Sequence, residues 1–248
     1  MGTKCRLERA AKCLVAAAAF LGGCQESVVG PVRIANRQFR SMTIAVAPAL
    51  NVSGSADLDS HRAADLMASE LSYVEGIDVI PVSRVLAALA DQNRERVESP
   101  GHAFELAKIV GADALLVFAV TEYDAYEPPV VGIAAQLYGR LPGARTVRFD
   151  PLGDPRRPAP APAFATDSSF APLAQTEHVF DASHEWVSAR VERFARHRSA
   201  DESPFGWRKY LASQQHYFRF CCHQTLRALM GQDAVEDADV DTKGSNES

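Results

Sequence analysis

A continuous apolar run at residues 114–120, A-L-L-V-F-A-V, constrains the fold of this chain more than any other feature. Because no polar residue alternates with the apolar ones, the run is typical of a strand buried on both faces of a sheet. A short helical pattern precedes it and ends at Gly111, a residue type that commonly terminates helices. Such a strand needs cover on two sides, so the run predicts a sheet with helices on both faces.

Strand and helix patterns alternate on the amino-terminal side of this run. Strands are predicted at residues 43–49 and 77–81, and helices at about 58–73, from Ser83 onward and at about 102–110. In the first of these helices, a spacing of three to four residues places the apolar side chains on one face, with Glu70 as a polar exception. These helices are expected to pack on the sheet.

A further strand, at residues 130–138, follows the buried run. The turn L-P-G at residues 141–143 is typical of a hairpin, and the alternation at residues 145–149 predicts an antiparallel edge strand after it. The order of all these elements predicts an α/β fold over residues 42–150, in which a mixed sheet flanked by helices forms three layers.

The carboxyl-terminal part of the chain differs in composition. Residues 151–176 are rich in proline, alanine and serine, which predicts a linker or surface loop. Residues 177–231 are predicted to form a C-terminal helical extension that packs on the α/β domain. The segment 232–248 holds six acidic residues and one lysine, so we expect a disordered acidic tail.

Two helices are predicted in the extension, one capped by Asp181 or Ser183 and one running from Ser203 to Met230. Aromatic side chains form part of an apolar stripe along the second helix: Trp207, Tyr210, Tyr217 and Phe218. A stripe at helical spacing is typical of a helix that covers the sheet. It also fits a docking face for a partner protein, because aromatic residues concentrate at binding hot spots.

The amino terminus has the pattern of a targeting segment. Four basic residues precede an apolar stretch too short to remain as a membrane span, so we expect residues 1–23 to be a cleaved signal peptide. Residues 21–24, L-G-G-C, resemble the lipobox of bacterial lipoproteins. The resemblance implies that Cys24 carries acyl chains such as palmitate and that residues 24–41 form a tether. The alternatives are an ordinary secretory signal and a cytoplasmic protein with an apolar amino terminus.

An acylated cysteine anchors a protein at a membrane surface. Gln25 stands where inner-membrane lipoproteins commonly carry Asp, so the resemblance implies the outer membrane, with the protein facing the periplasm. Loss of the leader removes four basic residues and Glu8, which changes the net charge from -5 to -8. Because Lys and Arg do not cluster in the sequence outside the leader, no nucleic-acid partner is expected.

Three stretches carry a second resemblance: I-A-V-A-P-A-L-N-V-S-G at residues 44–54, G-I-D-V-I-P-V-S-R-V-L at 76–86 and G-A-D-A-L-L-V at 111–117. Together they resemble the curli-assembly lipoprotein family and its relatives, among them the amino-terminal domain of the Tol-Pal translocation protein. The resemblance covers residues 42–138. It implies a periplasm-facing α/β domain that binds proteins and often oligomerises, and it does not imply catalysis.

Catalytic motifs are absent from the sequence: it holds no phosphate-binding glycine loop, no G-x-S-x-G elbow, no H-E-x-x-H and no C-x-x-C pair. No cofactor is predicted. Three carboxylates with two tyrosines between them follow the buried run, where α/β sheets often place their sites: Glu122, Tyr123, Asp124, Tyr126 and Glu127. They suit either a cation site or a solvated acidic loop.

Cys221 and Cys222 remain after the leader and the anchor are set aside. Adjacent cysteines in a helical pattern seldom bond to each other, so we interpret both as small buried residues, with a redox or metal role as the alternative. His216 and His223 lie two turns apart on the same predicted helix, too far apart to converge alone on one metal ion. No metal site is predicted.

These observations favour a non-enzymatic, lipid-anchored envelope protein that binds other proteins in assembly, secretion or cell-wall maintenance. Its expected partners are the membrane, through Cys24, and envelope proteins. One alternative is a lipid-anchored hydrolase or metal-dependent enzyme that uses the acidic loop after the buried run. Another is a structural subunit of an envelope oligomer, with homo-oligomerisation implied by the family resemblance.

Overall fold

A six-stranded mixed sheet is the centre of the fold. The computed structural model describes residues 33–39, 41–139, 171–198 and 203–232. In chain order the strands are β1 (Met42–Val46), β2 (Leu50–Asn51), β3 (Ile77–Ile80), β4 (Ala114–Asp124), β5 (Val130–Gly139) and β6 (Ala174–Asp181). Across the sheet they follow the order β3-β1-β4-β5-β6, and β2 also pairs with β4.

β4 contains the apolar run at residues 114–120, and every residue of that run is buried. β4 pairs in parallel with β1 and β2 and antiparallel with β5, which confirms the predicted mixed sheet. Because side chains alternate along a strand, Leu115 and Val117 belong to one apolar cluster, whereas Leu116 and Phe118 belong to the cluster on the other face.

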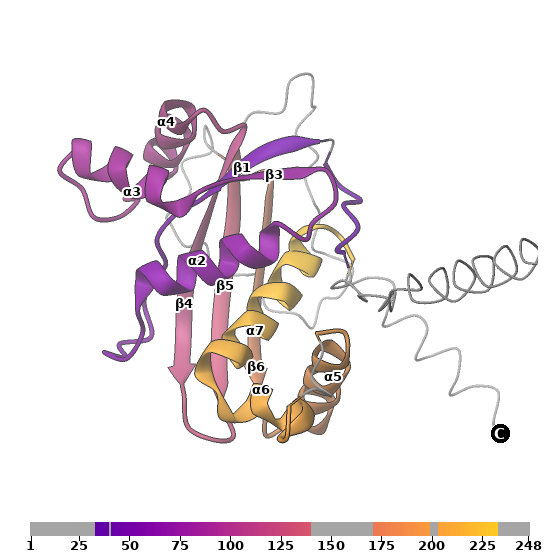
Figure 1. Ribbon diagram of the computed structural model, residues 1–248. Helices are drawn as coiled ribbons and strands as arrows, with labels where there is room; N and C mark the ends of the chain where they lie inside the picture. The colour runs from indigo at the N-terminus through magenta and orange to yellow at the C-terminus, as the bar shows by residue number, and fades with distance from the viewer. Residues whose placement is uncertain (1–32, 40, 140–170, 199–202, 233–248) are drawn as a thin grey trace, which may run out of the picture. The chain divides into compact units, whose positions relative to one another are not determined.

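Helices cover both faces of the sheet, which gives the three predicted layers. They are α2 (Ser60–Leu71), α3 (Val82–Asp91), α4 (Pro100–Val110), α5 (Glu185–Arg196), α6 (Lys209–Ala212) and α7 (Gln214–Leu229). α3 and α4 pack on the face of Leu115, while α2, α5 and α7 pack on the face of Leu116. α2 and α7 lie side by side across the strands (Figure 1). Among the described helices, none has both the length and the apolarity of a membrane span.

Local chemistry explains where these elements begin and end. α2 begins after Asp59, whose carboxylate accepts hydrogen bonds from two backbone amides of the first turn. α4 ends at Gly111, which has a φ of 75°, a left-handed conformation that glycine adopts without strain. Asp113 then accepts a hydrogen bond from the Thr43 amide at 2.7 Å and so joins the start of β4 to β1.

Two features of the carboxyl-terminal half differ from the sequence prediction. β6, at an edge of the described sheet, was not predicted as a strand, and its residues fall partly in the predicted linker 151–176 and partly in the predicted helical extension 177–231. The single helix predicted from Ser203 to Met230 is also wrong. The chain forms a 3-10 turn (Gly206–Arg208), then α6 and α7, with a break at Ser213, which has extended dihedrals. The Ser213 hydroxyl lies 2.9 Å from Nδ1 of His216, and such local side-chain bonds compete with a continuous helix.

The predicted tether 24–41 is part of the fold at its far end, because Ile34 is buried in the core and forms an isolated parallel bridge with Val74. Other predictions lie outside the described residues. These are the leader, Cys24, the turn at 141–143, the strand at 145–149, most of the linker, and the acidic tail beyond Gln232.

Candidate functional site

Glu70, the polar exception on the apolar face of α2, is a fully buried carboxylate. Arg198 binds it through two contacts, with Nη2 2.6 Å from Oε2 and Nη1 3.2 Å from Oε1. Arg219 on α7 adds a longer contact of 3.4 Å to Oε1. Burial raises the pKa of Glu70, but the closeness of His223 and the hydrogen bonds and charge of Arg198 outweigh this effect and lower it. The carboxylate is therefore held in its ionised form.

His223 lies beside this ion pair, with Nδ1 3.5 Å from Oε2 of Glu70. The contact lacks hydrogen-bond alignment, so this buried nitrogen has no hydrogen-bond partner among the residues that the structure describes. Burial lowers the pKa of His223, and the neighbouring Glu70 opposes that effect only in part. The ring is thus neutral at neutral pH, with one nitrogen left without a bond.

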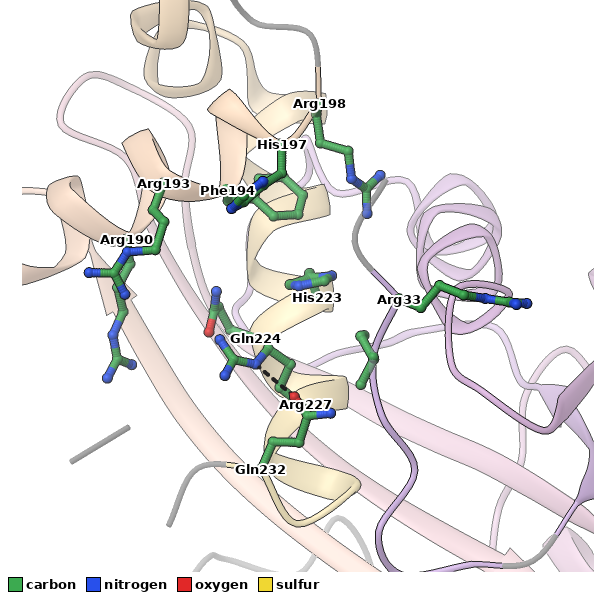
Figure 2. Close-up of a pocket in the computed structure, with 11 residues that line it drawn as sticks. Arg33, Arg190, Arg193, Phe194, His197, Arg198, His223, Gln224, Arg227 and Gln232 are labelled. Carbon is green, nitrogen blue, oxygen red and sulfur yellow. Dashed lines mark hydrogen bonds between the residues drawn. The ribbon is translucent and has the colours of Figure 1, made fainter. Parts of the chain in front are cut away.

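Arg198 and His223 also line a pocket of about 210 Å³, which we call the arginine pocket (Figure 2). Five arginines line it: Arg33, Arg190, Arg193, Arg198 and Arg227. No aspartate or glutamate belongs to the described lining. Basic residues that do not cluster in the sequence outside the leader are thus gathered by the fold, because these arginines lie far apart in the sequence.

Helix periodicity places most of these side chains. Arg190 and Arg193 lie three residues apart on α5, so both point from the same helix face. Arg227 projects from the last turn of α7, one turn after His223. Figure 2 shows the side chains from α5 and α7 on one side and Arg33 on the other, with the guanidinium of Arg33 pointing away from them. The pocket is thus built from α5, α7 and the segment before β1.

The end of α7 fixes one side of the pocket. Gly231 terminates the helix with a φ of 78°, a left-handed conformation, and this turns Gln232 back toward the pocket. Oε1 of Gln232 accepts a hydrogen bond from Nε of Arg227 at 3.1 Å, and Nε2 of Gln232 donates to the carbonyl of Ala35 at 2.6 Å. Through these two bonds, Gln232 connects Arg227 to the segment that carries Arg33.

A second, larger cavity of about 630 Å³ lies where α2 begins, β4 ends and α6 meets α7; we call it the groove. Tyr123 and Phe218 line it, and their rings meet edge to face with centroids 6.4 Å apart. Arg62 donates to Gln215 at 2.6 Å on the same lining. The groove therefore joins a tyrosine at the end of β4 to a phenylalanine of the aromatic stripe.

The aromatic stripe is mostly interior. Tyr210, Tyr217 and Phe218 are buried, and Trp207 is half-buried against the same core. The hydroxyl of Tyr217 donates to the carbonyl of Phe180 at 3.0 Å, which ties α7 to β6. This burial supports the interpretation in which the stripe covers the sheet, and only Phe218 also reaches the groove.

The acidic stretch is not a separate loop, because Glu122 and Asp124 belong to the end of β4 and pair with β5, and only Glu127 lies beyond the strand. Glu122, Asp124 and Glu127 are exposed, and Asp124 accepts a hydrogen bond from the Tyr126 amide at 3.0 Å, which shapes the loop itself. Across the residues that the structure describes, no three His, Cys, Asp or Glu side chains are grouped as metal ligands would be.

Cys221 and Cys222 are fully buried and unbonded, which confirms their interpretation as small core residues. Burial raises the pKa of both thiols well above the ordinary value. Because the thiolate is the reactive form, this burial keeps both cysteines chemically inert.

The sequence marks Glu70 as a polar exception, but neither its partners nor the arginine pocket was predicted. A signal for Glu70 existed, because it follows Leu66 and Met67 by four and three residues and so falls on the buried face of α2. A carboxylate at such a position requires a cationic partner. No comparable signal identified which arginines would meet.

No protein-family model matches the chain, and no curated protein matches it. Among solved structures, the chain is similar to the LpoB C-terminal domain from Salmonella enterica, at 10% identity and a TM-score of 0.39 over 57% of this chain and 84% of that one. It is also similar to lipoprotein GNA1162 from Neisseria meningitidis, at 20% identity and a TM-score of 0.37 over 62% of this chain and 96% of that one. The hypothetical protein CT253 from Chlamydia trachomatis gives 13% identity and a TM-score of 0.35 over 77% and 98% of the two chains. Similarity at this level assigns no function, and the resemblance to the curli-assembly family stays a prediction.

Proposed function

We propose that this chain is a non-enzymatic, lipid-anchored envelope protein that binds other proteins in assembly, secretion or cell-wall maintenance. The observation that carries the proposal is the amino-terminal sequence, in which basic residues, a short apolar stretch and L-G-G-C lead to Cys24. Acyl chains on Cys24 hold the protein at the outer membrane, facing the periplasm. Two or more chains are needed for stable anchoring, because one chain binds only reversibly.

The groove is the surface that we assign to partner proteins. It has a volume of about 630 Å³ and lies where α2 begins, β4 ends and α6 meets α7. Aromatic side chains, Tyr123 and Phe218, line it together with charged Asp57 and Arg62. Aromatic residues and arginine are enriched at protein interfaces, whose rims are polar. The exposed carboxylates of the acidic loop show no convergence that favours a hydrolase.

Labelling with a radioactive fatty acid tests the anchor. Wild type should incorporate the label and carry it into the outer-membrane fraction, whereas Cys24→Ala should lose it. Absence of label in the wild type would overturn the anchored location. A labelled protein in the inner membrane would overturn only the choice of membrane.

Site-specific photo-crosslinking in intact cells tests the groove. A photoreactive residue at Asp57, exposed on the groove, should give adducts of discrete mass that disappear in the Cys24→Ala background. The matched control is the same residue at Arg96, which is exposed in the segment between α3 and α4. Equal adducts at both positions would mean that the groove is not the binding surface. Elution of the purified chain at a multiple of its mass would instead favour the oligomer subunit.

A further inference from the structure

The groove lies at one end of the sheet, at the foot of β4 in Figure 1, where three chain segments meet. They are residues 52–59 after β2, residues 121–129 around the turn between β4 and β5, and residues 181–186 between β6 and α5. The amide of Val52 donates to the carbonyl of Val120 on β4 at 3.0 Å. Asp124, Val130 and Asp181 pair in turn across β4, β5 and β6. Because neighbouring strands lie about 4.8 Å apart, the three segments form one surface, which we call the acidic end.

Each of the three segments exposes one large apolar side chain. Val52 is 64% exposed, Tyr126 is 80% exposed and Trp186 is 52% exposed. The groove opens beside them, because its lining includes Asp57 and Tyr123 from the first two segments. Aromatic residues are enriched at protein interfaces and often contribute most of the binding energy. These side chains therefore extend the surface that the groove offers to a partner protein.

The carboxylates of the acidic end give it one sign of charge. The three segments contain no lysine or arginine and seven acidic residues: Asp57, Asp59, Glu122, Asp124, Glu127, Asp181 and Glu185. Asp59, Asp124 and Asp181 accept hydrogen bonds from backbone amides nearby, so they shape the chain locally. Across the described part of the chain, the other four carboxylates have neither a hydrogen-bond partner nor an ion-pair partner. They are therefore available to cationic groups of another molecule.

Two arginines border the acidic end, and each has a contact within the chain. Arg62 donates to Gln215 at 2.6 Å on the lining of the groove. The guanidinium of Arg190 lies over the ring of Trp186, 5.2 Å from its centroid. Seven carboxylates against these two guanidinium groups leave the surface with a net negative charge.

We propose that the acidic end, together with the groove, binds a partner protein through a segment rich in lysine and arginine. This inference rests on the proposal that the groove binds partner proteins, and it adds the chemistry of the partner. Complementary charges accelerate association and select against acidic competitors, while Tyr126 and Trp186 supply apolar contacts. A second copy of this chain fits less well, because its net charge is -5 and like charges across an interface are destabilising.

The position of the acidic end agrees with a protein partner. A strand rises about 3.3 Å per residue, so Asp124 lies about 33 Å along β4 from Ala114 at its other end. The chain that follows the proposed anchor joins the fold at that other end: Ile34 bridges Val74, and β3 then begins in register with Met42. The acidic end is therefore the end of the sheet remote from the point where the tether joins the fold.

Photo-crosslinking at Tyr126 in intact cells tests the charge of the partner. A photoreactive residue in place of Tyr126 should give an adduct of discrete mass. Mass spectrometry should locate the crosslink in a partner segment that contains more lysine and arginine than aspartate and glutamate.

Two double variants with the same change in charge test the carboxylates. Glu122→Gln with Glu127→Gln removes two carboxylates of the acidic end, and Glu75→Gln with Glu95→Gln, the matched control, removes two exposed carboxylates elsewhere. The adduct yield should fall at least about twofold in the first variant and stay at the parent level in the control. In a titration of the full-length Cys24→Ala chain with the crosslinked segment as a synthetic peptide, the first variant should bind about two- to thirtyfold more weakly, because each exposed ion pair contributes a factor of about 1.4 to 5. Added salt should weaken the binding of the parent.

The results at Asp57 separate failure of this inference from failure of the proposed function. Adducts from a photoreactive residue at Asp57, in a partner segment without an excess of lysine and arginine, would overturn the inference and leave the groove as a partner surface. Equal losses in the two double variants would overturn it as well, because the effect is then one of net charge. An adduct of twice the mass of the chain would replace the basic partner with a second copy. No adduct from either Tyr126 or Asp57 would overturn both proposals.

Discussion

Removal of Arg198 should destabilise this protein more than neutralisation of its partner Glu70. The side chain of Glu70 is 0% exposed and that of Arg198 is 11% exposed and borders the arginine pocket. In Arg198→Met, the carboxylate stays buried and keeps only the 3.4 Å contact with Arg219 and the unaligned His223. In Glu70→Gln, the guanidinium keeps an amide acceptor and access to water.

Magnitudes follow from these environments. Removing one partner of a buried ion pair costs about 3–5 kcal/mol, and Arg198 makes two contacts to Glu70, at 2.6 and 3.2 Å. We expect Arg198→Met to lower the free energy of unfolding by about that amount, which corresponds to roughly 6–20 °C in Tm for a chain of this size. Glu70→Gln keeps the geometry and loses only the charge, so we expect a cost of about 1–3 kcal/mol. The double variant should be more stable than Arg198→Met alone, because no charge remains stranded.

Urea unfolding of the four proteins at neutral pH measures these values. The pKa of Glu70 lies below its ordinary value, so its ionised form stabilises the wild type above about pH 4.5, and this contribution is lost as the pH falls through the lowered pKa. Without Arg198, burial dominates and the pKa of Glu70 rises. The cost of Arg198→Met should therefore shrink as the pH falls and the carboxyl group takes up a proton. A larger cost for Glu70→Gln than for Arg198→Met, or a constant cost with pH, would refute this account.

Two further predictions concern other hydrogen bonds on the same face of the sheet. Asp59→Ala should lower the free energy of unfolding by about 0.5–2 kcal/mol, because Asp59 caps α2 through the amides of its first turn. Chemical denaturation measures this loss. An unchanged denaturation midpoint would contradict the capping role. Tyr217→Phe should lower the free energy of unfolding by about 1–2 kcal/mol, because the carbonyl of Phe180 loses its donor inside the core. Backbone amides of β6 should then exchange hydrogen faster. Unchanged protection of these amides would show that the bond does not stabilise the strand.

The central strand of the fold was predictable because its apolar sequence suits only a position buried on both faces of a sheet. A seven-residue apolar run without alternation requires cover on two faces, and β4 is buried along that whole run. β6 was not predictable in the same way. Among the described strands it pairs only with β5, and most of its residues are half-buried, so its sequence lacks the apolar pattern that marks a central strand.

The candidate site follows a different rule, because its chemistry arises from side chains that meet across the fold. Glu70 predicts a cationic partner, since a carboxylate on a buried helix face must be paired. The sequence does not identify Arg198 as this partner, because 128 residues separate it from Glu70 and several other arginines precede it. The pair in turn fixes the chain just after α5 to α2, and that connection holds Arg198 at the wall of the arginine pocket. Stability of the core and geometry of the pocket wall are therefore coupled through one ion pair.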